Sequence, residues 1–125
     1  MAVIKTITVD GQEVKFKASA AIPRIYRARF GRDLFKDLDA LVSDINENDA
    51  NSSTLPVESL EVFENISFLM ARYADPSVPD DPVQWLDRFE TFSIYNILPQ
   101  ILELWGLNTA TDSESKKKAD PAADR

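Results

Sequence analysis

Two short segments of alternating apolar and polar residues open the chain, over residues 3–9 and 13–17. An Asp10-Gly11 pair lies between them. Because Asp-Gly between alternating segments favours a two-residue turn, the pattern predicts a β-hairpin over residues 3–17. An isolated hairpin is only marginally stable in water, so we expect it to pack on the helices or to pair with another copy of the chain.

The spacing of apolar residues becomes helical after Ser19, the expected N-cap of a helix that begins near residue 20. Gly31 suits the end of that helix, and Asp33 can cap the next one. The first helix carries apolar residues at intervals of four, namely Ile22, Tyr26 and Phe30. The second has an amphipathic stripe formed by Leu34, Leu38, Leu41, Val42 and Ile45.

A third helix is expected after a polar loop at residues 46–53. Thr54 is its expected N-cap, with Pro56 in the first turn. It should end at Asp75-Pro76, because a residue before proline is disfavoured in helical geometry. Its broad apolar stripe predicts a largely buried, central helix and consists of Val62, Phe63, Ile66, Leu69, Met70 and Tyr73.

Residues 75–82 contain three prolines and form a stiff connector. Asp81 is the expected cap of a short helix with Pro82 at its first position. One side of this helix carries Trp85, Leu86 and Phe89.

The last helix should begin at Ser93 or Asn96 and end at Gly106. Pro99 would remove a backbone hydrogen bond from a helix that begins at Ser93 and would kink it, at a cost of about 3 kcal/mol. In a helix that begins at Asn96, Pro99 falls in the first turn and little is lost. We therefore expect either a kink or two short helices, with a broad apolar face formed by Ile94, Ile97, Leu98, Ile101, Leu102 and Trp105.

The fold class that these elements predict is α+β, mostly α. An N-terminal β-hairpin (residues 3–17) precedes about five helices (residues 20–106) in a compact bundle. Residues 1–107 form one globular domain in this interpretation. Residues 108–125 are polar and small, so we expect a disordered C-terminal tail.

Composition narrows the classes of function. Cysteine and histidine are both absent, which removes thiol nucleophiles, histidine bases and His/Cys metal sites. We expect no enzymatic activity, no metal and no cofactor. Residues 1–9 lack a signal-peptide core, and the apolar stretches are too interrupted to cross a bilayer, so we expect a soluble cytoplasmic protein without membrane contact.

The acidic side chains could instead suggest carboxylate catalysis, which would need two of them to converge with raised pKa values. They lack the spacing of a calcium-binding loop. Solvated helix faces and helix caps are the favoured interpretation.

The net charge of −7 is unevenly distributed. Residues 1–36 hold eight basic and three acidic groups, whereas residues 37–106 hold two basic and fourteen acidic groups. Such a body would repel nucleic acid, so we expect no nucleic-acid binding. The arginines near the first helix are expected to pair mainly within the molecule. Contacts between copies are the alternative, and Arg24 and Arg27 are the candidate self-association charges.

The aromatic C-terminal segment could supply core or contact surface. Tryptophan often anchors interfaces, and a small domain rarely hides every large side chain. Trp85, Leu104 and Trp105 are therefore the candidate partner-binding residues, with burial in the core as the alternative for both tryptophans.

Two segments resemble the tail assembly chaperones of long-tailed bacteriophages of Gram-positive hosts. IPRIYRARFGRDLFKDLDAL (residues 22–41) is similar to the opening helices of that family, and WLDRFETFSIYNILPQILELWG (residues 85–106) is similar to its closing segment. FENISFLMARYADP (residues 63–76) also fits, and the resemblance extends to about residue 118.

The resemblance implies a non-enzymatic chaperone that keeps the tape measure protein soluble while the tail tube polymerises. The family acts in the host bacterial cytoplasm and is absent from the mature virion. Many of its genes make a longer product by ribosomal frameshift, and the lysines at residues 116–118 fit a slippery site. The resemblance implies the short form. The major tail protein is an additional candidate partner, and the split charge and the edge of the hairpin make further copies of the chain another. A structural or connector protein that stays in the virion is the alternative.

Overall fold

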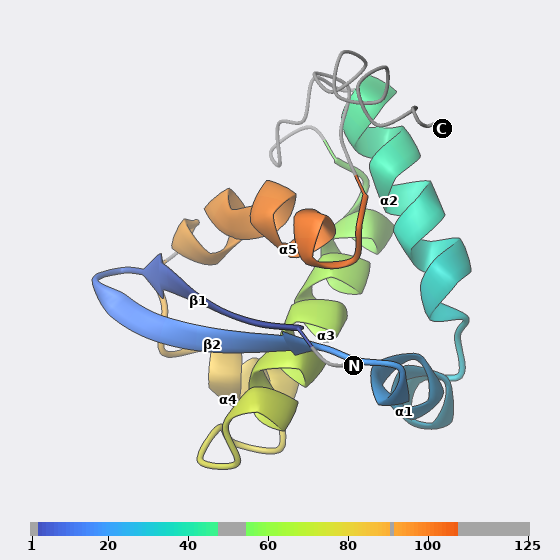
Figure 1. Ribbon diagram of the computed structural model, residues 1–125. Coiled ribbons are helices and arrows are strands. Elements are labelled where there is room, and N and C mark those ends of the chain that lie inside the picture. Colours follow the sequence, from blue (N-terminus) through green and yellow to red (C-terminus); the bar gives the residue numbers. More distant parts are fainter. Residues whose placement is uncertain (1–2, 48–54, 91, 108–125) are drawn as a thin grey trace, which may run out of the picture.

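The computed structural model describes residues 3–47, 55–90 and 92–107. The predicted class is confirmed, because a two-stranded hairpin precedes a mostly helical body (Figure 1). The strands and first helices are β1 (Val3–Val9), β2 (Gln12–Ala18), α1 (Ala21–Phe30) and α2 (Leu34–Glu47). The remaining elements are α3 (Val57–Ala74), α4 (Pro82–Leu86), the 3₁₀ helix η2 (Ser93–Ile97) and α5 (Leu98–Leu104). The Thr54 cap and the disordered tail at 108–125 lie outside the described residues.

The hairpin forms around the predicted turn. Asp10 and Gly11 both have positive φ, at 56° and 74°. Two consecutive left-handed residues give the turn a twist that matches that of the strands, which is why Asp-Gly is favoured here. The antiparallel register runs from Val9 opposite Gln12 to Val3 opposite Ala18.

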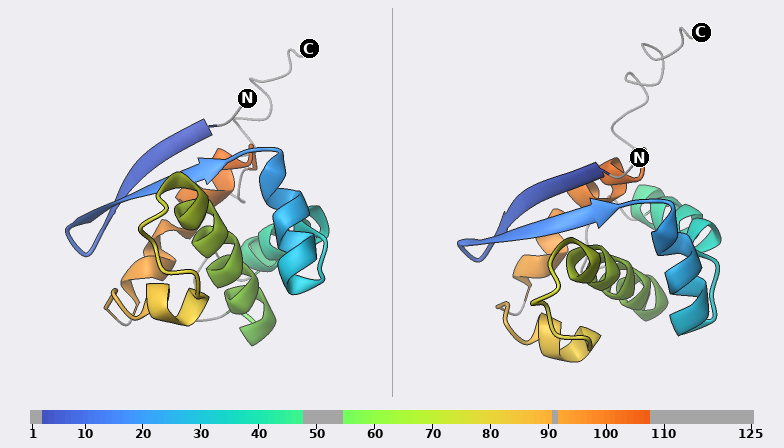
Figure 2. Two further views of the ribbon diagram at one scale, coloured as in Figure 1. Left: turned by 90° about the horizontal axis from the view of Figure 1, so that it is seen from below. Right: turned by 60° about the horizontal axis from the view of Figure 1, so that its bottom comes forward.

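One face of the hairpin packs on the helices. Its inward residues alternate with exposed ones and are buried: Ile7, Val9, Val14, Phe16 and Ala18. Strand β2 packs mainly on α3 and β1 also contacts η2, and β1 lies farther from α3 than β2 does in both views of Figure 2. The expectation that the hairpin packs on the helices is confirmed.

The ends of α1 and α2 follow the local sequence signals with two exceptions. Gly31 ends α1 in the left-handed conformation, and Asp33 accepts hydrogen bonds from the amides of residues 35 and 36, as predicted. Ser19 does not cap α1 through its side chain; instead its carbonyl accepts a bond from the Ile22 amide at 3.1 Å. Helix α2 also continues to Glu47, two residues into the predicted loop, and residues 48–53 of that loop lie outside the described chain.

Helix α3 is central and largely buried, as its stripe predicts. It begins at Val57, and Pro56 is its N-cap rather than a residue of its first turn. The prediction for Tyr73 is wrong, because this side chain is 47% exposed. The loop after α3 folds back on Arg72, whose guanidinium donates to the carbonyls of Pro76 and Val78.

The C-terminal segment forms two short helices, one of the two expected outcomes. The 3₁₀ helix η2 ends at Ile97, and α5 begins at Leu98 with Pro99 in its first turn. Pro99 therefore loses no helical hydrogen bond.

Candidate protein-binding groove

Helix α4 places two apolar side chains on opposite sides. Asp81 accepts a hydrogen bond from the Gln84 amide at 2.9 Å, and Pro82 occupies the first position, as predicted. The single turn that follows directs Trp85 into the core and leaves Val83 72% exposed. The cap and the single helical turn thus place Trp85 in the core and Val83 on the surface.

Trp85 belongs to the core, so its assignment as a partner-binding residue is corrected. It is 0% exposed and contacts three aromatic rings, with centroids at 6.3 Å (Phe16), 6.2 Å (Phe68) and 5.2 Å (Phe89). Its Nε1–H finds no acceptor within the described chain, which costs about 1–3 kcal/mol. Burial of an aromatic side chain of this size contributes about 4–6 kcal/mol, so the core position is favoured.

A groove lies beside this anchor, between α4 and η2. Its volume is about 280 Å³, and its lining consists of Val83, Leu86, Asp87, Phe89, Glu90, Ile94 and Tyr95. It continues past Phe89 and Glu90 into a wider, shallower hollow of about 590 Å³ whose lining includes Phe92, Ser93 and Asn96. We call the two together the α4–η2 groove.

Apolar surface is exposed along this groove to an unusual degree. Phe92 is 70% exposed, more than any other aromatic side chain in the described ranges, and Val83 at the other end is 72% exposed. Leu86 and Phe89 between them are half-buried. Exposed apolar side chains at both ends of a hollow with a mixed polar and apolar lining are typical of a site that binds another polypeptide.

The rim of the groove is acidic. Asp87 and Glu90 line it and are exposed. Arg88 lies between them in sequence but is not among the residues that line the groove. The charge that a ligand meets along the groove is therefore negative.

The groove is held in place by contacts to distant segments. The Glu90 amide donates to the Asp10 carboxylate at 2.6 Å, and Gln12 Nε2 donates to the Arg88 carbonyl at 3.2 Å. Tyr95 donates its hydroxyl proton to Glu64 of α3. Burial, followed by this hydrogen bond, raises the pKa of Tyr95 to about 12, so the phenol is neutral at physiological pH. The hairpin and α3 thus hold residues 88–90 and Tyr95 in place.

Leu104 and Trp105 lie at the end of α5, away from α4 (Figure 1). Both are half-buried and pack against the core. Trp105 Nε1–H points inward, toward the Met70 sulfur at 3.3 Å. The structure therefore does not bring Trp85, Leu104 and Trp105 together, and partner binding by Leu104 and Trp105 stays a prediction.

The arginines near α1 divide into two groups. Arg29 pairs with Asp80 at 2.6 Å, and Arg32 binds both carboxylate oxygens of Asp37 at 2.7 and 2.9 Å. The expected pairing within the molecule is confirmed for these two. Arg24 and Arg27 are exposed and form no ion pair within the described parts of the chain, so their role in self-association stays a prediction.

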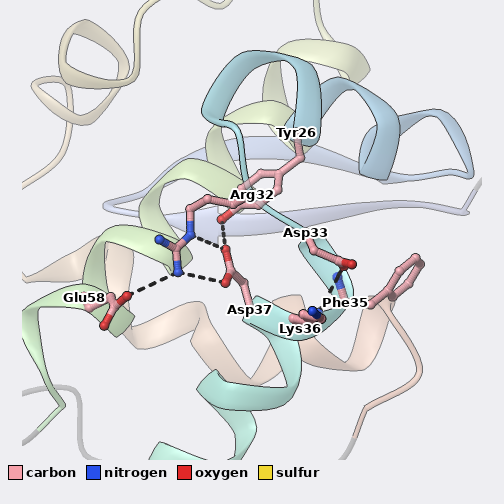
Figure 3. A network of polar contacts seen from close by, with 7 residues as sticks. All are labelled: Tyr26, Arg32, Asp33, Phe35, Lys36, Asp37 and Glu58. Atoms are coloured by element: carbon pink, nitrogen blue, oxygen red, sulfur yellow. Dashed lines mark hydrogen bonds and ion pairs between the residues drawn. The ribbon is translucent and has the colours of Figure 1, made fainter.

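The Asp37 cluster joins three helices (Figure 3). Tyr26 of α1 donates to Asp37 of α2 at 2.6 Å, and Arg32 also reaches Glu58 of α3 at 3.2 Å. Burial would raise the pKa of Asp37, but the hydrogen bonds from Arg32 and Tyr26 together outweigh it, so that pKa is lowered. Burial and the bond to Asp37 raise the pKa of Tyr26. The cluster is a structural clamp in which Tyr26 and Arg32 both donate hydrogen bonds to Asp37.

The residues that sequence reasoning missed are Val83 and Phe92. Each is an apolar residue that departs from the amphipathic pattern of its neighbours, and that departure is the signal that could have identified them. In the described ranges, no three acidic residues are placed to hold a metal ion, and no helix is long and apolar enough to cross a membrane. Comparisons with known protein families, curated proteins and solved structures find no match to this chain.

Proposed function

We propose that this protein is a non-enzymatic tail assembly chaperone of a bacteriophage that binds the tape measure protein through the α4–η2 groove. The observation that carries the proposal is the exposure of Phe92 and Val83 at the two ends of the α4–η2 groove. The groove lies almost entirely within residues 85–106, the segment that resembles the closing part of the chaperone family.

The chemistry of the groove suits a helical client. A groove lined by leucine, isoleucine and aromatic side chains can cover the apolar stripe of one amphipathic helix. Such a stripe would otherwise pair with other copies of the client and aggregate. The acidic rim keeps the complex soluble, because like-charged complexes repel one another. This activity needs binding and release, with no bond made or broken.

Co-expression tests the proposal directly. The full chain and the cognate tape measure protein are produced together, and the soluble fraction of the tape measure protein is measured by quantitative immunoblot. We expect a clear increase over the tape measure protein alone, and a smaller increase with Phe92→Ala. An unchanged soluble fraction would contradict the proposal.

Analysis of mature particles separates this proposal from its alternative. A chaperone acts in the host cytoplasm and leaves before the tail is complete, so mass spectrometry of purified virions should not detect it. A stoichiometric amount in the particles would instead identify a structural or connector protein.

A further inference from the structure

Strand β1 has one edge that no described residue covers with hydrogen bonds. The two-residue turn makes Val9 and Gln12 a hydrogen-bonded pair, so alternate residues of β1 from Val9 to Val3 bond to β2. The residues between them, Ile4, Thr6 and Thr8, direct their N–H and C=O groups away from β2. Their side chains are exposed, and none of their backbone groups takes part in any other hydrogen bond within the described chain.

The two edges of the hairpin differ in chemistry. On β2, the outward residues are Glu13, Lys15 and Lys17, and charged side chains of this kind discourage pairing with another strand. On β1, the corresponding residues are uncharged and β-branched, which favours strand pairing. Ile4 is 57% exposed and Val3 is 50% exposed. The β1 edge therefore lacks the charges that protect the β2 edge.

We propose that two copies of this chain pair through their β1 edges, antiparallel and about a two-fold axis at Thr6. The resulting sheet has four strands in the order β2–β1–β1–β2. This inference goes beyond the proposed function and does not depend on it, because it rests on the register of the hairpin alone.

The register of the two β1 strands follows from the number of outward N–H and C=O groups that each possible axis pairs. An axis at Thr6 places Thr6 opposite Thr6 and Ile4 opposite Thr8, so every outward N–H and C=O of these three residues is paired. An axis at Lys5 would set two ammonium groups directly opposite each other, which destabilises a sheet. An axis at Ile7 would set Ile4 opposite Asp10 of the turn, where the strand has ended.

The β1 edge of a second copy is the partner that this edge can bind, because the edge is complementary to itself. With the axis at Thr6, the single charge of each strand, Lys5, lies opposite the uncharged Ile7 of the second copy. Pairing also brings the exposed Ile4 against Thr8, which removes apolar surface from water on the outer face. A helical client cannot supply the row of backbone groups that this edge requires.

Cysteine cross-linking tests the register, since the natural chain contains no cysteine. Hydrogen-bonded residues opposite each other have Cα atoms about 5.5 Å apart, within the range of a disulfide. Thr6→Cys should therefore form a covalent dimer under mild oxidation. Thr8→Cys is the matched control, because two Thr8 positions would lie about 13 Å apart or more along the strand and should not cross-link. Equal cross-linking at both positions, or none at Thr6→Cys, would overturn the proposal.

Light scattering tests the association without a cross-link. We expect the natural chain to have about twice its monomer mass of 14.1 kDa at high concentration. Thr6→Pro removes an outward N–H of β1 and should give a monomer by light scattering that is still folded by circular dichroism. Lys15→Pro removes the outward N–H of the residue opposite Thr6, on the β2 edge, and should stay dimeric. A monomeric natural chain, or a dimer that survives Thr6→Pro, would contradict β1 pairing. Should both proline variants lose the hairpin, the cross-linking result decides.

Discussion

Phe92→Ala offers the most direct measure of the α4–η2 groove. Full burial of a phenylalanine side chain contributes about 1.5–3 kcal/mol. Because 70% of Phe92 is still exposed in the free chain, a bound partner that covers it can gain about 1–2 kcal/mol from this side chain. Its removal should therefore raise the Kd for the tape measure protein by about 5- to 30-fold. The free energy of unfolding should change by about 0.5 kcal/mol or less, since the side chain contributes little to the core.

Phe35→Ala is the matched control. Phe35 is 61% exposed at the start of α2 and takes no part in the groove, so the variant removes nearly the same apolar surface from a different place. Isothermal titration calorimetry with a soluble tape measure fragment gives both Kd values, and thermal unfolding by circular dichroism checks stability. Equal losses of affinity in the two variants would show that general surface hydrophobicity, not the groove, drives binding. An unchanged Kd for Phe92→Ala would refute the assignment of the groove.

Three further changes test the scaffold. Trp85→Ala should lower the free energy of unfolding by about 3–5 kcal/mol in urea denaturation, and a loss below about 1 kcal/mol would be inconsistent with its core position. Asp37→Asn should lower the free energy of unfolding by about 1–2 kcal/mol at pH 7. Because the lowered pKa of Asp37 stabilises the fold above the unfolded pKa of about 3.9, the difference in unfolding free energy between the natural chain and Asp37→Asn should shrink as the pH falls below about 4. Urea denaturation at several pH values measures this difference, and a constant difference would contradict the reasoning. Asp81→Ala removes the cap of α4 and should cost about 0.5–2 kcal/mol by thermal unfolding, whereas Asp39→Ala, at an exposed position inside α2, should cost far less.

Local signals predicted the boundaries of the elements well. The Asp10-Gly11 turn, the Gly31 helix end and the break around Pro99 each depend on the backbone preferences of one or two residues. The failure at Ser19 is also local. Ser19 has the right side chain for a cap, but its backbone carbonyl accepts the hydrogen bond from the Ile22 amide instead.

The candidate site could be predicted only in part, because segments distant in sequence decide which of its side chains are buried. Trp85 is buried because Phe16 and Phe68 enclose it, and both are remote in sequence. Phe92 is exposed because η2 begins immediately after it and turns Ile94 inward. The burial of Trp85 does not follow from residue type or spacing, and the only signal for the exposure of Phe92 is its departure from the amphipathic pattern of its neighbours.

The hydrogen bonds between the hairpin turn and residues 88–90 have a consequence for the order of folding. The hairpin leaves the ribosome before the helices, yet the residues that anchor its turn lie 76 and 80 positions further along the chain. Contacts between segments so far apart must wait for closure of a long loop, which slows folding. During translation, the nascent hairpin therefore has its uncharged β1 edge available before the helices that support it have been made.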